Sequence, residues 1–185
     1  GIVPAEDMGH FAGKIYDEAQ RLIVLIQDII KLSKLDEKDG MMEKEWVELD
    51  VLLEEVCERL QPTAEKRGVH LTADLIPLGI RGVRPVLMEM AYNLCDNGIR
   101  YNRPEGTVHM ILRKELGNAV LEVSDTGIGI PQEEQKRIFE RFYRVDGSRS
   151  VEKGGTGLGL SIVKNGAALH GGKVSVRSTP GQGTV

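Results

Sequence analysis

The distribution of glycine constrains the fold of this chain more than any other feature of its sequence. Glycine accounts for 22 of the 185 residues, above the usual share of about 7%, and ten of the glycines fall between Gly147 and Gly183. Gly127 and Gly129 follow a strand-like segment, and the glycines of residues 154–159 lead into an apolar, helix-like segment. Such local clusters indicate backbone that turns sharply or approaches a ligand closely, rather than disorder.

The overall composition is that of an ordinary globular protein, with 41% hydrophobic and 28% charged residues. The longest uninterrupted apolar run spans five residues, 22–26, whereas a membrane-spanning helix needs about 20. A net charge of −4 gives no electrostatic reason to expect a nucleic-acid partner. Cys57 and Cys95 lie outside any metal-binding spacing, which predicts reduced core cysteines in a cytosolic protein.

One long helix is predicted in the first 40 residues. Its apolar residues recur at steps of three and four, the period of a heptad seam, and a polar stretch at residues 36–40 ends the pattern. Further apolar residues at Ile23, Leu25, Ile30 and Leu32 widen the stripe, which favours packing in a bundle of several helices. The seam consists of Ala12, Ile15, Ala19, Leu22, Ile26 and Ile29.

The rest of the chain is predicted to alternate between strands and helices. Helical periodicity covers residues 51–67, 85–101 and 158–169, and the last helix is expected to stop at Gly171-Gly172. A turn at Gly117-Asn118 would join two antiparallel strands. This arrangement predicts an α+β fold, a two-layer sandwich with about three helices on one face of a mixed sheet. The predicted strands are 46–49, 69–76, 107–116, 119–124 and 173–177.

Asn93 and Asn97 lie one turn apart on the predicted helix 85–101, so their carboxamides share one face of it. Neutral carboxamide oxygens suit a hard cation such as Mg²⁺, whose other ligands are phosphate and water. A polar helix face with incidental asparagines is the alternative interpretation.

The sequence Asp125-Thr-Gly127-Ile-Gly129 directly follows a predicted strand. Its two glycines allow the backbone to approach a ligand closely, and the aspartate can accept a hydrogen bond from a buried donor. An ordinary turn with an aspartate cap is the alternative. A dinucleotide fingerprint is excluded, because Gln132 occupies the position of its third glycine.

The glycine-rich residues 154–159 can expose backbone N–H groups to a phosphate at the start of the following helix. The sequence has no Walker motif, which excludes P-loop chemistry, and a flexible linker is the alternative interpretation. The polar segment before these glycines is typical of a lid over a ligand. Its basic residues Arg144, Arg149 and Lys153 either reach a polyphosphate or are solvated surface charges.

Four segments resemble, in order, the N, G1, F and G2 boxes of sensor histidine kinases: YNLCDNGIRYN, DTGIGIP, RIFERFYRVD and GGTGLGLSIVK. The segment LIVLIQDIIKLSKLD is similar to the end of the second helix of that family's dimerisation and phosphotransfer hairpin. The resemblance implies that residues 1–40 are that helix and a linker, from an incomplete hairpin. Residues 41–185 would be a catalytic ATP-binding domain of the Bergerat fold, with its last strand truncated.

The resemblance implies that Mg-ATP binds with its adenine near the strand-end aspartate. Asp125 would accept a hydrogen bond from the adenine amino group, a match that the guanine carbonyl lacks. Gly127 and Gly129 would let the backbone come close to the base. Three further residues would line the base pocket: Tyr101, Ile130 and Phe142.

At the phosphate end, the resemblance assigns the metal to Asn97, with Asn93 supporting the same polar face. Arg100 would contact phosphate, and Arg144 would neutralise charge during transfer. The loop that wraps the phosphates would consist of Gly155, Thr156, Gly157, Leu158 and Gly159.

The resemblance also bears on the type of reaction. Related gyrase and MutL-type ATPases carry a glutamate one turn before the metal-binding asparagine, where it activates water. Asn93 takes that place here, and an amide cannot act as a general base. The implied reaction is therefore transfer of the γ-phosphoryl group of ATP to a protein histidine, and thence to an aspartate of a response regulator, rather than efficient hydrolysis.

No HE(L/I)(K/R)TP-like box, which carries the phosphoacceptor in this family, occurs in the sequence. His10 is followed by Phe-Ala-Gly-Lys, and His70, His109 and His170 fall in strand-like or turn-like contexts. We therefore expect the acceptor histidine to lie outside this chain, and the chain alone not to autophosphorylate.

The resemblance further implies a homodimer through the N-terminal helix and a response regulator as partner. It implies a cytoplasmic location, with anchoring in the bacterial inner or plasma membrane only through upstream segments. Two other functions stay open: a module that binds ATP without catalysis, and an anti-sigma-type serine kinase on the same fold. The heptad helix before Glu43 argues against the serine kinase.

Overall fold

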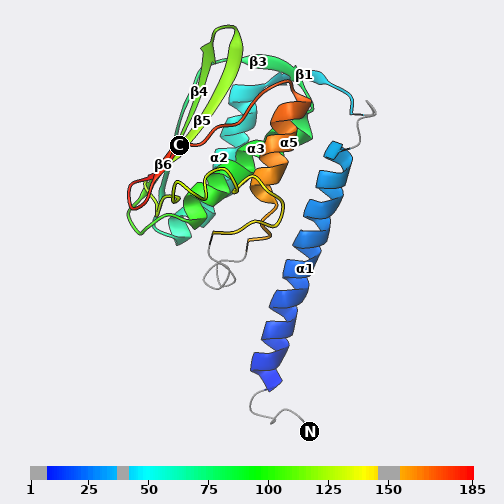
Figure 1. The fold of residues 1–185 in the computed structure, drawn as a ribbon, viewed down its shortest axis with the longest axis vertical. Coiled ribbons are helices and arrows are strands. Elements are labelled where there is room, and N and C mark those ends of the chain that lie inside the picture. The colour runs from blue at the N-terminus through cyan, green and yellow to red at the C-terminus, as the bar shows by residue number, and fades with distance from the viewer. Residues whose placement is uncertain (1–7, 37–41, 146–154) are drawn as a thin grey trace.

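The computed structural model describes residues 8–36, 42–145 and 155–185. A long helix, α1 (Met8–Asp36), lies along one side of a layered body built from the other elements (Figure 1). The elements after α1 are β1 (Glu45–Glu48), α2 (Leu49–Lys66), β2 (His70–Leu75), β3 (Gly79–Gly82), α3 (Arg84–Arg100), β4 (Thr107–Glu115), β5 (Asn118–Asp125), α5 (Gly159–Leu169), β6 (Ser178–Thr179) and β7 (Gly183–Thr184).

Five strands form a mixed sheet in the order β2-β4-β5-β7-β6. β2 and β4 are parallel, and the other neighbours are antiparallel. β1 and β3 pair separately as an antiparallel ribbon. α2, α3 and α5 lie on one side of the sheet (Figure 1). The predicted α+β sandwich, with helices on one face of a mixed sheet and one long helix before it, is confirmed.

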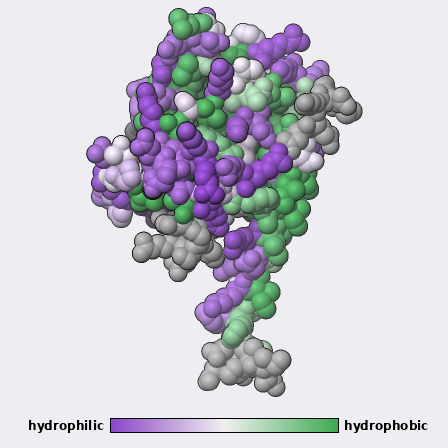
Figure 2. Space-filling model, in the orientation of Figure 1, coloured by the Kyte–Doolittle hydropathy of each residue, from purple (hydrophilic) through white to green (hydrophobic). Residues whose placement is uncertain are grey.

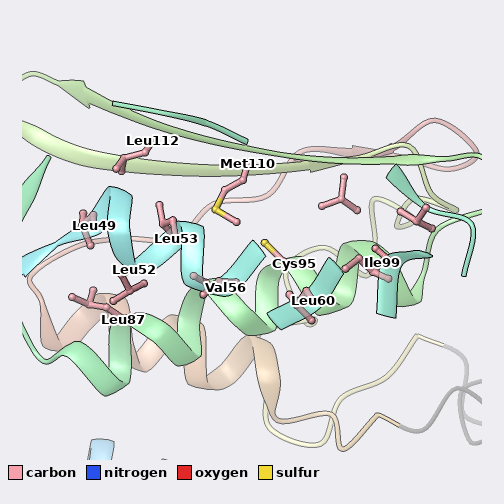
Figure 3. Close-up of a cluster of buried hydrophobic side chains, with 14 of the residues drawn as sticks. Leu49, Leu52, Leu53, Val56, Leu60, Leu87, Cys95, Ile99, Met110 and Leu112 are labelled. Carbon is pink, nitrogen blue, oxygen red and sulfur yellow. The ribbon is translucent and has the colours of Figure 1, made fainter. Parts of the chain in front are cut away.

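The hydrophobic core fills the space between the sheet and helices α2 and α3 (Figure 3). On β4, Val108, Met110 and Leu112 are buried at every second residue, as expected of a strand with one covered face. Cys95 and Ile99 of α3 also face this core, so the asparagines of α3 lie on another side of the helix. The buried residues of α2 follow the helical period: Leu49, Leu52, Leu53, Val56, Leu60 and Ala64.

The wide apolar stripe of α1 is divided between two surfaces. Leu32 is buried against α5, and Leu25 and Leu35 are partly buried there. The predicted heptad seam faces outward: Ile15 is 70% exposed and Ile26 is 56% exposed, and apolar surface runs along α1 in Figure 2. Of the helices that the structure describes, none is long and apolar enough to cross a membrane.

The predicted turn at Gly117-Asn118 is wrong by one residue. β5 already begins at Asn118, and the turn residues are Leu116 and Gly117, with φ of 49° and 84°. A two-residue turn with positive φ at both positions matches the twist of a hairpin. The register is fixed within the strands, because it places Met110 opposite Val123 and keeps apolar side chains on the covered face.

Two strand predictions also need correction. β3 has no counterpart among the predicted strands, because its two glycines lower β-propensity. The predicted strand 173–177 is not formed as a whole: Val174 and Val176 are half-buried at alternate positions, but only Arg177 exchanges backbone hydrogen bonds with Val185, and β6 starts at Ser178. β7 separates β6 from β5 and is two residues long, so residues 173–176 have no ladder partner among the described strands.

Candidate functional site

The polar face of α3 carries the two asparagines predicted to bind a ligand, and both are half-buried. The Nδ2 of Asn93 donates hydrogen bonds to the backbone oxygen of Glu89 (2.9 Å) and to its carboxylate (3.3 Å). Its Oδ1 faces the start of α5, where a Cβ on Gly159 would lie only 2.7 Å away. Glycine at this position therefore permits the close approach of α5 to the face that bears Asn93 and Asn97.

Asp125 ends β5 close to the same helix. Its Oδ1 accepts a 2.8 Å hydrogen bond from the N–H of Gly127, and its Cβ lies 3.6 Å from the place of a Cβ on Gly98 of α3. Burial raises the pKa of the Asp125 carboxyl, while backbone N–H groups of Gly127 and Thr184 oppose that rise. A half-buried carboxylate whose desolvation is only partly offset by backbone hydrogen bonds is a candidate for ligand recognition.

The turn after Asp125 is clamped by its neighbours. A Cβ on Gly127 would lie 2.5 Å from the carbonyl oxygen of Tyr101. Gly129 has a φ of +68°, and a Cβ there would lie 2.1 Å from a carbonyl oxygen of β6. The N–H of Ile130 donates to the hydroxyl of Ser178 (2.8 Å). Both predicted close-approach glycines are thus required by contacts within the protein itself.

The glycine-rich residues before α5 lie next to the end of α3. A Cβ on Gly155 would lie 3.7 Å from the guanidinium of Arg100 and 3.6 Å from the hydroxyl of Tyr101. Gly157 has a φ of +73° and accepts a 2.9 Å hydrogen bond from the N–H of Phe142. The structure therefore brings the predicted phosphate loop beside the α3 residues predicted to contact phosphate and base.

Some predicted site residues have partners elsewhere in the protein. The side chain of Leu158 is fully buried, packed with Leu32 of α1, so only its backbone can face a ligand. The hydroxyl of Thr156 donates a 2.7 Å hydrogen bond to Asp28 of α1. Phe142 is 57% exposed and has a positive φ of 62°, so its contact with a base stays a prediction.

The basic residues of the site are only partly described. Arg100 forms a 2.7 Å ion pair with Asp96, one turn earlier on α3. Arg144 is half-buried near the end of the segment 42–145. Three residues of the predicted lid and loop lie outside the described residues: Arg149, Lys153 and Gly154.

Two contacts from α1 were not predicted. Besides the bond from Thr156 to Asp28, the ammonium of Lys31 lies 2.8 Å from the carboxylate of Glu89 on α3. Asp28 and Lys31 lie in the segment that resembles the second helix of the hairpin, but that resemblance assigns them no contact with the site. Their spacing of three residues places them on one helix face. Contacts between segments so distant in sequence are not readable from local patterns.

The histidines of the chain do not gather at this site. His170 is structural: its Nε2 accepts the N–H of Val83 (3.0 Å), and its Nδ1 lies 2.7 Å from a carbonyl oxygen of α5. His70 and His109 lie on β2 and β4, and His10 is exposed on α1. The bond to Val83 ties the end of α5 to the start of α3 and so holds the two helices that carry the site.

The site combines three chemical groups. A partly buried carboxylate can recognise an amino donor, carboxamide oxygens suit a hard cation, and the glycine-rich approach to the N-terminus of α5 suits an anion. A ligand that carries an amino-substituted base at one end and phosphates with a divalent cation at the other matches this set.

Comparison with known proteins finds relatives along nearly the whole chain. Residues 82–185 match the family described as histidine kinase-, DNA gyrase B- and HSP90-like ATPases. The sensor-like histidine kinase SenX3 of Mycolicibacterium smegmatis is 40% identical over 177 residues, which cover 94% of this chain and 46% of SenX3. The chain thus spans less than half the length of this relative.

Solved structures of histidine kinases have the same fold. The mycobacterial sensor histidine kinase MprB is 29% identical and superposes with a TM-score of 0.67, covering 76% of this chain and 92% of that one. Full-length ShkA in complex with AMPPNP is 26% identical, with a TM-score of 0.82 over 98% of this chain and 38% of that one.

Proposed function

Since the chain belongs to the family of histidine kinase-, DNA gyrase B- and HSP90-like ATPases, we propose that it is the Mg-ATP-binding catalytic part of a two-component sensor histidine kinase. The observation that carries the proposal is the close approach of the Asn93 carboxamide to Gly159. A Cβ added at Gly159 would lie only 2.7 Å from the Oδ1 of Asn93. This contact joins the asparagine face of α3 to the glycine-rich start of α5, segments that are distant in sequence.

Asp125 is the proposed adenine-recognising residue. Its carboxylate is an acceptor held in place by the backbone of Gly127, and it matches the amino donor of adenine but repels the carbonyl of guanine. Gly127 and Gly129 let the turn pack against Tyr101 and β6, which would hold it beside the base, while Tyr101 and Ile130 flank the base. This part of the site selects the nucleotide.

Asn97 is the proposed metal-binding residue, supported by Asn93. The donor set fits Mg²⁺, because carboxamide oxygens are hard ligands and Mg²⁺ keeps phosphate and water as its others. When bound, the ion neutralises phosphate charge and favours phosphoryl transfer. Arg100, Arg144 and the backbone of residues 155–159 would orient the same phosphates.

Phosphoryl transfer to a protein is favoured over hydrolysis, because neither residue placed to activate water on α3 is a free general base. Asn93 cannot accept a proton. Glu89, one turn earlier, has its carboxylate engaged by Lys31 at 2.8 Å and by Asn93 at 3.3 Å. Activation of water by either residue is therefore disfavoured.

We assign residues 1–40 to the second helix of a dimerisation and phosphotransfer hairpin and its linker, and residues 41–185 to the catalytic domain. The exposed seam of α1 supports dimerisation of the parent protein, since an apolar stripe of this length favours burial against other helices. A response regulator is the proposed final phosphate acceptor. We place the domain in the cytoplasm of a parent protein anchored in the membrane by upstream segments.

Phosphotransfer in trans tests the proposal. The chain is incubated with γ-³²P-ATP and a separate helical hairpin domain that bears an acceptor histidine from a related kinase. We expect acid-labile label on the hairpin, lost when its histidine is replaced by glutamine. ATP binding without label would favour a module that only senses ATP, and acid-stable label on serine would favour the serine kinase.

A further inference from the structure

α1 docks on the wall of the proposed nucleotide site. Leu32 of α1 is buried with Leu158 and Ile162, and Leu158 is the N-cap of α5. Leu25 and Leu35 continue this contact to either side of Leu32 along the helix. The docked face of α1 therefore reaches the end of the glycine-rich loop.

The same face of α1 makes two polar contacts across the site. Asp28, whose side chain is only 13% exposed, accepts the hydroxyl of Thr156 at 2.7 Å. That hydroxyl oxygen in turn accepts the N–H of Leu158 at 3.3 Å. One turn later, Lys31 pairs with Glu89 at 2.8 Å. α1 is thus tied to the phosphate loop by one residue and to the asparagine helix by another.

These contacts place negative charge beside the loop. The ammonium of Lys31 lies 3.8 Å from the carboxylate of Asp28 and 2.8 Å from that of Glu89. One positive charge is therefore paired with two negative charges, and the group of three side chains keeps a net negative charge. Charges at this range interact appreciably when they are partly shielded from water. A triphosphate at the loop would meet both the residual negative charge and a Thr156 hydroxyl that is already engaged.

We propose that α1 is a built-in competitor of the nucleotide: when docked, Asp28 holds Thr156 and opposes the phosphates of ATP, and undocking of α1 raises the affinity for ATP. This inference rests on the proposed ATP site and concerns its regulation. Because coupling between two binding events is reciprocal, ATP binding must also weaken the docking of α1.

Substitution of Asp28 and Lys31, which tie α1 to the two sides of the site, tests the proposal. Asp28→Asn removes the negative charge that opposes the phosphates, and Lys31→Met removes the ion pair with Glu89 that docks α1. We expect each substitution to tighten binding of a fluorescent ATP analogue by about 3- to 10-fold, with both effects reduced at about 1 M salt. Affinity for AMP, which lacks the outer phosphates, should change by less than about twofold.

Asp17→Asn is the matched control, because Asp17 is an exposed acid on α1 and belongs to the undocked half of the helix. It should leave the affinity unchanged. If α1 acted only as a scaffold that supports the site, both docking variants would loosen it and lower the affinity.

The outcomes separate this inference from the proposed function. Tighter binding in both docking variants confirms the competition, whereas binding that is equal in all variants, or weaker in the docking variants, overturns it and leaves the ATP site intact. Binding seen only in Asp28→Asn also supports competition. If no variant binds any adenine nucleotide, the proposed function fails and the inference fails with it.

Discussion

The N–H of Gly127 donates a 2.8 Å hydrogen bond to the carboxylate of Asp125, and this bond fixes the acid at the end of β5. A carboxylate offers two acceptor oxygens, so it can satisfy the backbone and still accept from a ligand. An asparagine offers one acceptor and one donor group. If the carboxamide oxygen of this asparagine accepts the N–H of Gly127, its NH₂ donor faces the amino group of adenine, which is also a donor.

Asp125→Asn should therefore weaken ATP binding. We expect a loss of about 1.5–3 kcal/mol, the usual contribution of a hydrogen bond to a charged group. Titration with a fluorescent ATP analogue measures the change. Unchanged affinity would remove Asp125 from the site.

The same substitution should stabilise the protein without nucleotide. Burial raises the pKa of Asp125, so the protonated carboxyl favours the folded state at low pH, and this contribution is lost as the pH rises through the raised pKa. The substituted carboxamide cannot ionise. Urea unfolding should give Asp125→Asn a higher free energy of unfolding than the original chain at about pH 7. This difference should shrink as the pH falls toward about 4. A difference that is constant with pH would contradict a raised pKa of Asp125.

Gly129→Ala tests the clamped turn. Alanine at this position is strained by the φ of +68°, and its Cβ would clash with a carbonyl oxygen 2.1 Å away. We expect a loss of about 3 kcal/mol or more in the free energy of unfolding. Gly181→Ala is the matched control, with φ +77° and no atom within 4 Å of its Cβ. It should lose only about 1–2 kcal/mol. Equal losses would mean that the turn can move away from β6.

Asn97→Ala should abolish the part of ATP affinity that depends on Mg²⁺. Removal of the carboxamide takes away the proposed protein ligand but not the adenine contact at Asp125, so weak binding measured in EDTA should persist. The exposed Asn118→Ala is the control and should keep the full Mg²⁺ effect. A normal Mg²⁺ effect in Asn97→Ala would assign the metal elsewhere.

His170→Ala should destabilise the fold by about 1–3 kcal/mol, because it leaves the N–H of Val83 without its acceptor. His70→Ala, at a residue with a 66% exposed side chain, should change the free energy of unfolding by no more than about 0.5 kcal/mol. Urea denaturation compares the two. If both variants are equally stable, the link between α5 and α3 does not contribute to the fold.

Ile26→Asp should reduce self-association of the chain. Ile26 is 56% exposed on the seam of α1, and a charge there opposes burial of that stripe against a second copy. Sedimentation should show a concentration-dependent mass for the original chain and a smaller one for the variant, with Gln20→Asp as an exposed control on the same helix. A monomer at all concentrations in the original chain would refute association through α1.

Sequence patterns predict most of the fold because burial follows the period of each element. α3 begins at Arg84 and carries Pro85 in its first turn, and β4 buries Val108, Met110 and Leu112 in alternation, as their patterns indicate. The hairpin turn is displaced because pairing along the whole strand, and not the local Gly-Asn dipeptide, fixes the register.

The candidate site could be predicted only in part. The glycines after Asp125 and before α5 can be identified from the sequence, because a side chain at most of these positions would clash with neighbouring segments of the protein. The link from Asp28 to Thr156 spans 128 residues and joins a polar helix position to a loop. Docking of α1 creates this contact, and no local pattern encodes it.

Calorimetric titration with Mg-ATP and Mg-GTP tests the central claim, an adenine-specific nucleotide site, most directly. We expect saturable binding of one Mg-ATP per chain, about tenfold or more tighter than Mg-GTP, with this preference lost in Asp125→Asn. Equal affinity for the two nucleotides, or absence of binding to both the original chain and Asp28→Asn, would contradict it.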